Sequence, residues 1–259
     1  MLIYKNIDFN FDEKSHKYTV SKQIGDKWTV ATPVTGVTTI IGIISKPALM
    51  TWPMNEAVKY LKSKTQPFSE LDWKNATNAY KVKSQYGKDA GHVGHSTVEA
   101  LLLGKQPEKP PEALQEACTS ILNAFNKYRE DFKPKNLHSE EIMYSLEHNF
   151  AGTVDDVSEI DGKTIITDYK TTNPSYYNPD GIYKEHYCQL GGYIILVEEM
   201  LGLTVDEAQV VNLPKDGSEY KIKSLSEMGL TTLDAKLYFL HALGLYKLDG
   251  LVGGRLHGQ

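Results

Sequence analysis

Two carboxylates and a lysine form the first candidate site. Asp155 lies six residues before the Asp161-Gly162 pair, and Asp168-Tyr169-Lys170 begins six residues after it. Asp-Gly is typical of a two-residue hairpin turn, so Asp155 and Asp168 are expected side by side on antiparallel strands. Two close carboxylates repel unless a cation or proton lies between them, and oxygen ligands suit Mg²⁺ or Mn²⁺. The pattern predicts a metal site beside Lys170, which could orient a water.

The acid-x-Lys triplet alone is uninformative, because the chain contains seven copies. The copy at Asp168 differs in closing an apolar strand that opens into a polar loop. Residues i and i+2 of a strand share a face, so Asp168 and Lys170 point together. Asp156 is expected on the opposite face, as a surface acid.

A helical histidine is the second candidate. His95 shares a helix face with Gly91 and Glu99. The glycines before it, Gly91 and Gly94, weaken a helix by about 1 kcal/mol each, which indicates close approach of another segment. Histidine is a good metal ligand, although on a helix it is more often structural.

Two further clusters are weaker. Gln189 and Tyr193 share one face of a later helix, where they could bond to a phosphate or stack on a base. Glu140 and Glu141 begin the first strand of the expected sheet. An ordinary half-buried tyrosine and strand-edge acids would explain both clusters equally well.

The elements that must position these residues follow from periodicity and turn signals. We expect strands at 16–20, 27–31, 138–150, 153–160, 163–170 and 208–213, and helices at 47–61, 69–103, 110–132, 183–201 and 226–247 before a loose glycine-rich tail. This is an α/β pattern with one central sheet. We expect a single domain, with a mainly helical part at 1–109, a catalytic core at 110–215, and a final helix and tail at 216–259.

Composition excludes several classes of protein. The chain has 259 residues, of which 41% are hydrophobic and 24% charged, so it is not disordered, collagen-like or a disulfide scaffold. No apolar run approaches the roughly 18 residues of a membrane helix, and no signal or transit peptide is visible. We therefore expect a soluble, intracellular protein.

The net charge of −5 is unusual for a nucleic-acid binder, but its distribution is uneven. Residues 56–91 contain seven lysines and four acids, which gives +3 there and leaves −8 elsewhere. Either this is a solvated helix face or it is a surface that follows phosphates.

The ordered set of candidates resembles a known family. Taken in order, His95, Glu140, Asp155, Asp168-Tyr169-Lys170 and Gln189-x-x-x-Tyr193 resemble the motifs of the PD-(D/E)xK nucleases. They look most like the RecB-like branch, which includes phage exonucleases and the mitochondrial genome-maintenance exonuclease. Residues 32–41 also look like an N-terminal signature of the phage members, so the resemblance covers about residues 15–215.

The resemblance implies a restriction-endonuclease-like core, a central mixed sheet flanked by helices, with a helical N-terminal addition arching over the site. Its lysines would guide a DNA strand. The metal ligands would be Asp155, Asp168, the carbonyl of Tyr169 and His95. Lys170 would position or activate the attacking water.

The remaining matches have supporting roles. Gln189 and Tyr193 would line the DNA path and support the site. Glu140 matches the acid often found on the first strand, with the choice between it and Glu141 open.

The sequence departs from the family in a few places. Val154 stands where the superfamily name has proline, and two distant cysteines exclude the four-cysteine iron–sulfur cluster of some members. Arg129 and Arg255 are the only arginines, so lysines, backbone amides and helix N-termini must supply phosphate contacts.

The predicted function is that of a cytoplasmic deoxyribonuclease, an exonuclease that uses Mg²⁺ or Mn²⁺ in phage-type DNA recombination, repair or replication. A single-strand annealing protein is a possible partner. The alternatives are an endonuclease of the same fold, a non-catalytic DNA-binding or assembly protein, and an unrelated α/β protein with coincidental motifs. Polarity, strand preference, processivity and oligomeric state stay open.

Overall fold

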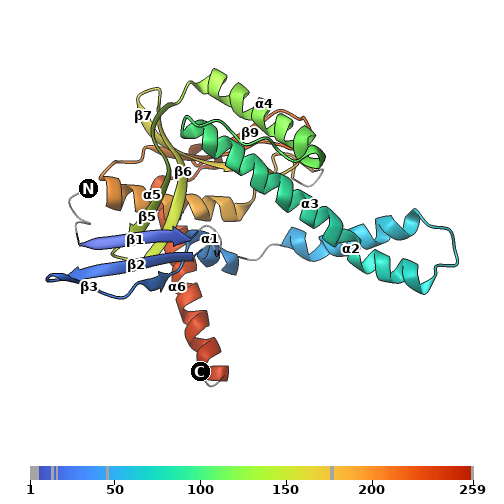
Figure 1. The fold of residues 1–259 in the computed structure, drawn as a ribbon, viewed down its shortest axis with the longest axis horizontal. Coiled ribbons are helices and arrows are strands. Elements are labelled where there is room, and N and C mark those ends of the chain that lie inside the picture. The colour runs from blue at the N-terminus through green and yellow to red at the C-terminus, as the bar shows by residue number, and fades with distance from the viewer. Residues whose placement is uncertain (1–5, 13–14, 16, 45–46, 176–177, 258–259) are drawn as a thin grey trace.

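The computed structural model describes residues 6–12, 15, 17–44, 47–175 and 178–257 (Figure 1). Its strands are β1 (Ile7–Asp12), β2 (Lys17–Ile24), β3 (Lys27–Trp28), β4 (Thr32–Val34), β5 (Lys135–Ser145), β6 (Phe150–Ile160), β7 (Lys163–Lys170), β8 (Glu207–Asn212) and β9 (Lys221–Ser224). Its α-helices are α1 (Val37–Ile40), α2 (Pro47–Lys62), α3 (Glu70–Leu102), α4 (Gln115–Phe132), α5 (Lys184–Leu201) and α6 (Thr232–His257). Short 3-10 helices lie at Ile41–Ile43, Glu112–Leu114 and Ser226–Met228.

A five-stranded mixed sheet forms the centre of the molecule. Its order is β5-β6-β7-β8-β9; β7 and β8 are parallel and the other pairs antiparallel. The β6–β7 hairpin turns at Asp161-Gly162, where both residues have positive φ, with Ile160 opposite Lys163. The predicted α/β class with a central mixed sheet is confirmed.

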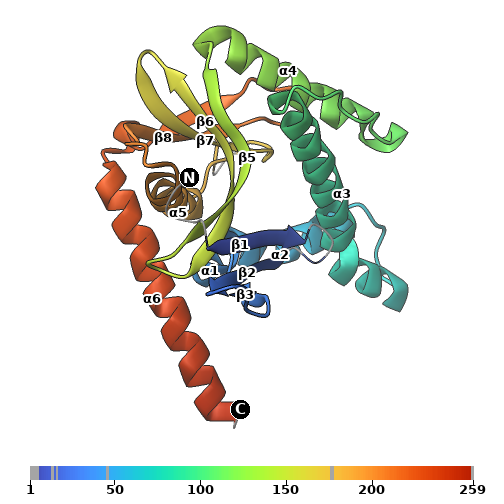
Figure 2. The same ribbon diagram turned by 60° about the vertical axis from the view of Figure 1, so that its left-hand side comes forward.

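Helices cover both faces of this sheet. On one face α5 lies between the sheet and α6 (Figure 2), and its buried residues join sheet residues such as Val157, Ile166 and Val210 in the largest apolar cluster. On the other face, α4 and the end of α3 pack over Tyr169 and Val211. Both faces of β6 and β7 are therefore buried, which decides where their polar side chains can point.

Glycines let α6 approach α5 closely. A Cβ on Gly191 would collide with the backbone of Ala235, and one on Gly192 would lie 2.9 Å from the ring of Phe239. The two helices that close this face of the sheet thus touch almost backbone to backbone.

A second, smaller sheet precedes the core. The Gly25-Asp26 turn joins β2 and β3 as the sequence predicts, while β2 also pairs with β1 and β4. The strand expected at 27–31 is divided, because β3 ends at Trp28 and β4 begins at Thr32. His16, expected in the first strand, lies outside the described residues. Val20 and Val34 pack on Tyr144 and Ala151 of the central sheet.

The helices α2 and α3 form an arm that projects from the rest of the molecule (Figure 1). Ser69 caps α3 by accepting a hydrogen bond from the Asp72 N–H, while the Asp72 carboxylate accepts one from the Ser69 N–H. α3 then runs from the tip of the arm back to the central sheet, so it connects the arm to the candidate site.

The C-terminal helix is longer than expected. The sequence predicts a helix at 226–247 and a loose tail, because glycine costs about 1 kcal/mol in a helix. In the structure α6 starts at Thr232 and continues to His257. Among the described residues, no helix is both long enough and apolar enough to cross a membrane.

Candidate active site

The β6–β7 hairpin brings the two predicted carboxylates together. Asp156 is paired with Thr167, so Asp155 and Asp168 are the next residues of the same ladder. The Tyr169 N–H donates a hydrogen bond of 2.9 Å to Asp155 Oδ2. Asp155 is half-buried and Asp168 is fully buried. Burial raises the pKa of both carboxyls, that of Asp168 to about 6.

Lys170 lies directly on Asp168. Its ammonium donates a hydrogen bond of 2.7 Å to Oδ1 and lies 2.5 Å from Oδ2. Oδ2 is buried and accepts no hydrogen bond, so the short contact with the ammonium is an ion pair without hydrogen-bond geometry. Asp168 thus presents one uncommitted oxygen to the site.

Glu140 is the third carboxyl of the cluster. In β5 it lies between Ser139 and Glu141, which are paired with Asp156 and Val154, so Glu140 is opposite Asp155. Its φ of 51° is in the left-handed region, which costs a residue with a Cβ roughly 1–2 kcal/mol. Burial, and next the charge of Asp155, raises the pKa of Glu140 to about 9.

Glu141 points elsewhere. Its Oε1 lies 2.8 Å from Nδ1 of His138, and its side chain is 43% exposed. Of the two glutamates that the sequence leaves open, Glu140 is the one beside Asp155.

His95 reaches the site from α3. Burial, and next the charge of Lys170, lowers its pKa to about 4, while a hydrogen bond with the backbone of Tyr169 opposes this shift. Its ring is therefore uncharged at neutral pH, the form that binds metals. The glycines before it explain the close approach of α3: a Cβ on Gly94 would collide with Ile121 of α4, and one on Gly91 would lie 3.1 Å from Thr171 Oγ1.

Gln189 and Tyr193 support the site from α5. Gln189 Nε2 donates a hydrogen bond of 2.6 Å to the Tyr193 hydroxyl, and both side chains are 4% exposed. Burial, and next the charges of Asp155 and Asp168, raises the pKa of Tyr193 well above its usual range. The phenol thus lies near the carboxylates, but its ring is too buried for a base to stack on it.

The expectation for Asp156 is wrong. Asp156 is fully buried, because α4 covers the face of the sheet opposite to the site. Its carboxylate accepts hydrogen bonds from Ser158 Oγ at 2.6 Å, Asn136 Nδ2 at 3.0 Å and the Tyr169 hydroxyl at 3.0 Å. These donors oppose the burial that raises its pKa.

Lys215 is at the site although sequence reasoning missed it. It follows β8 closely, and the parallel β7 and β8 end at the same edge. Its ammonium donates a hydrogen bond to the carbonyl of Thr171, and its charge helps to lower the pKa of His95. Burial lowers the pKa of Lys215 itself. The signal available was its position just after an apolar strand expected beside the Asp168 strand.

These side chains suit a hard divalent cation. The donors are carboxylate oxygens, one uncharged imidazole and the free, buried Oδ2 of Asp168. The carboxyl pKa values are raised in a cluster that only Lys170 and Lys215 neutralise. A cation held by Asp155, Asp168 and His95 would relieve that repulsion.

A different group has the tighter arrangement. Within the described ranges, one set of three acidic or histidine side chains has ligand atoms all within 4.8 Å of one another: Glu147, His148 and Glu199. It lies at the β5–β6 turn, and Glu199 Oε1 already accepts a hydrogen bond from Ser145. Glu147 is 76% exposed. The sequence predicts none of these three as ligands.

Comparison with known proteins identifies the family of the core. The family model of the PD-(D/E)XK nuclease superfamily matches residues 72–243, which include every predicted site residue. No curated protein matches the sequence.

Similar solved structures share little sequence with this chain. A Eubacterium rectale protein assigned as an exonuclease is 13% identical with a TM-score of 0.41; the match covers 62% of this chain and only 64% of that one. LHK-Exo, an alkaline exonuclease from Laribacter hongkongensis solved with dAMP, is 14% identical with a TM-score of 0.33, over 64% of this chain and 84% of that one. A phage-related exonuclease from Haemophilus somnus is 13% identical with a TM-score of 0.33, over 77% and 94%. Similarity at this level says nothing about activity, so the assignment depends on the family model.

Proposed function

The chain belongs to the PD-(D/E)XK nuclease superfamily, and from this premise we propose that it is a DNA exonuclease that requires Mg²⁺ or Mn²⁺. The observation that supports this best is the group of Asp155, Asp168 and Lys170 on adjacent strands, with a hydrogen bond of 2.7 Å between Lys170 and Asp168. Two acids followed by a lysine are the residues that name the family, here at one end of a buried hairpin.

In this proposal Asp155, Asp168 and His95 hold the cation, with the backbone of Tyr169 beside them. A bound divalent cation would supply positive charge to the scissile phosphate and lower the pKa of a coordinated water. Lys170 holds the attacking water and offsets charge that builds up on the phosphate. Gln189 and Tyr193 fix the carboxylates from below, and Lys215 adds a second positive charge at the strand edge.

The broader assignments rest on the family resemblance alone. We propose that the chain forms a single nuclease domain in the cytoplasm, that it acts on linear DNA in phage-type recombination or repair, and that it works with a single-strand annealing protein. Each of these is separable from the chemistry of the site.

The experiment that tests the function uses end-labelled linear DNA, single- and double-stranded, beside a covalently closed circle. We expect metal-dependent loss of the linear DNA, an intact circle and no cleavage in EDTA. The position of the label gives the polarity. A cut circle would instead establish an endonuclease, and retained binding without any cleavage would establish a non-catalytic DNA-binding protein.

A further inference from the structure

A sevenfold repeat runs along α3 towards the candidate site. Lysine stands at positions 74, 81 and 88, and the next position of the series is His95. Seven residues fall about 20° short of two helical turns, so these four side chains follow one slowly drifting stripe. With a rise of about 1.5 Å per residue, the stripe is about 30 Å long and its members are about 10 Å apart.

The residues between these lysines keep the stripe open. The fourth residue of each repeat, which lies on the same face, is small: Thr77, Ser84 and Gly91. Asp89, the one acid between Lys74 and His95, points away by about a quarter turn from Lys88 and accepts a hydrogen bond of 2.7 Å from Gln85. No acidic side chain therefore competes for the lysines along this face.

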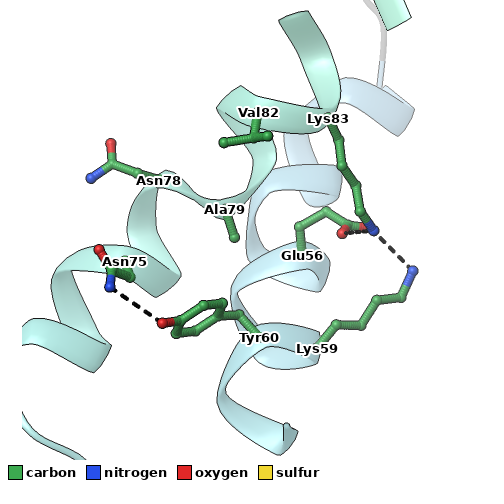
Figure 3. A pocket seen from close by; sticks show the side chains of 8 residues that line it. All are labelled: Glu56, Lys59, Tyr60, Asn75, Asn78, Ala79, Val82 and Lys83. Atoms are coloured by element: carbon green, nitrogen blue, oxygen red, sulfur yellow. Dashed lines mark hydrogen bonds and ion pairs between the residues drawn. The ribbon is translucent and has the colours of Figure 1, made fainter. Parts of the chain in front are cut away.

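The three lysines are exposed and without ion pairs among the described residues, unlike their neighbours on the arm. Lys83 and Lys59 point into the groove between α2 and α3, where both pair with the buried Glu56 (Figure 3). The arm thus divides its lysines between two uses. One set neutralises a buried acid that joins the two helices, and the other carries uncompensated charge on the outer face.

The stripe ends where the site begins. Gly91 lies against Thr171, which follows β7, and a Cβ on it would be 3.9 Å from the ammonium of Lys215. His95, one turn further, interacts with the backbone of Tyr169. The row of positive charge on the arm therefore continues into Lys215 and Lys170 at the strand edge.

We propose that Lys74, Lys81 and Lys88 bind the phosphate backbone of one DNA strand and hold it on the arm while its end occupies the site. The partner follows from charge and spacing: a backbone with one phosphate per about 3.4 Å of each strand presents every third phosphate at about 10 Å. Small side chains between the lysines allow the sugar–phosphate chain to approach α3. This inference rests on the proposed function for the identity of the strand.

The test compares two triple variants that remove equal charge. Lys74→Gln, Lys81→Gln and Lys88→Gln are combined in one variant; the control combines Lys105→Gln, Lys109→Gln and Lys163→Gln, which are exposed and away from the arm. Binding of a fluorescein-labelled 30-nucleotide strand is measured against salt in EDTA, and hydrolysis of the small diester bis-p-nitrophenyl phosphate is measured with Mn²⁺.

We expect the slope of log K against log salt to fall by about 2 in the stripe variant, since each lost contact with a single strand removes about 0.7. Over the decade from 1 M to 0.1 M salt this corresponds to about 100-fold weaker binding. A four-nucleotide strand, too short to reach Lys74, should lose far less affinity, and diester hydrolysis should be unchanged.

Equal slopes in the two triple variants would overturn the stripe, whatever the protein hydrolyses. Equal loss for the short and long strands would overturn it as well. Failure of the wild type to cleave either DNA or the small diester would count against the proposed function instead, and the binding slopes would still decide the role of the lysines.

Discussion

The phenol of Tyr169 donates a hydrogen bond of 3.0 Å to Asp156 on the face of the sheet opposite to the candidate site. The backbone N–H of the same tyrosine donates to Asp155 on the site face. Tyr169 is therefore held from behind at the point where it orients an acid in front. The polar network beneath α4 and the candidate metal ligands are parts of one assembly.

Removing the Tyr169 hydroxyl should weaken the fold. Tyr169→Phe leaves Asp156 buried with two donors instead of three, which we expect to cost about 1–3 kcal/mol in urea unfolding. Tyr220→Phe is the control, because its hydroxyl bonds to the more exposed Asp131 at 2.8 Å and should cost less than about 1 kcal/mol. Equal losses in the two variants would show that the Asp156 network contributes nothing special.

The acid and the lysine of the site should be needed for turnover but not for folding. We expect Asp168→Asn and Lys170→Met each to lower kcat on linear DNA by a factor of about 100 or more, with a circular-dichroism spectrum like that of the wild type. Lys163→Gln, at the other end of β7, should cleave normally. Cleavage at the wild-type rate by Asp168→Asn would show that the site is elsewhere.

Divalent metal should stabilise the protein through Asp168. At a concentration of Mn²⁺ 100 times its dissociation constant, binding to the folded state contributes about 2.7 kcal/mol, visible as a higher Tm. We expect Asp168→Asn to abolish this rise and Glu147→Gln, in the group at the β5–β6 turn, to preserve it. The reverse pattern would move the metal to Glu147, His148 and Glu199.

The buried glutamate of the arm should make stability depend on pH. A hydrogen bond from Lys83 lowers the pKa of Glu56, so its contribution is present above the unfolded pKa of about 4.5 and is lost as pH falls below it. We expect the wild type to exceed Glu56→Gln in urea unfolding at pH 7, and the difference to shrink below pH 4.5. Tryptophan fluorescence reports on the arm, which contains Trp52 and Trp73. A difference independent of pH would exclude the ionised carboxylate as its cause.

Lys215 should help to bind the substrate. A hydrogen bond to a charged group contributes about 1.5–3 kcal/mol, which corresponds to a ten- to hundredfold loss of kcat/KM for DNA in Lys215→Gln. We expect Lys215→Arg to recover much of this loss, because it keeps the charge. Unchanged kcat/KM in Lys215→Gln would leave this lysine a purely structural contact of Thr171.

Local signals were enough to predict the centre of the site. The Asp161-Gly162 turn sets the register of β6 and β7, and with it the pairing of Asp155 and Asp168. The helical spacing of Gln189 and Tyr193 likewise places them together, with a hydrogen bond that the sequence does not state. Each of these relationships depends on a few neighbouring residues.

Relationships over long distances in the chain were not predictable in this way. The burial of Asp156 depends on which face α4 covers, and Lys215 reaches the site only through the parallel pairing of β7 with β8. The polar β9 has no apolar alternation to reveal it, and the burial of Glu140 beside Asp155 depends on the unusual φ of that residue within β5. In each case tertiary packing outweighs the local pattern.

The distance along the chain between His95 and Lys215 has a consequence during synthesis. The site needs α3, the β6–β7 hairpin and the strand that follows α5, so no early fragment contains all of its groups. Contacts between such distant segments form late, because the entropy of closing long loops must first be overcome. A chain still being made on the ribosome therefore has no complete centre, and the host's nucleic acids meet the assembled site only after β8 has left the exit tunnel and joined the sheet.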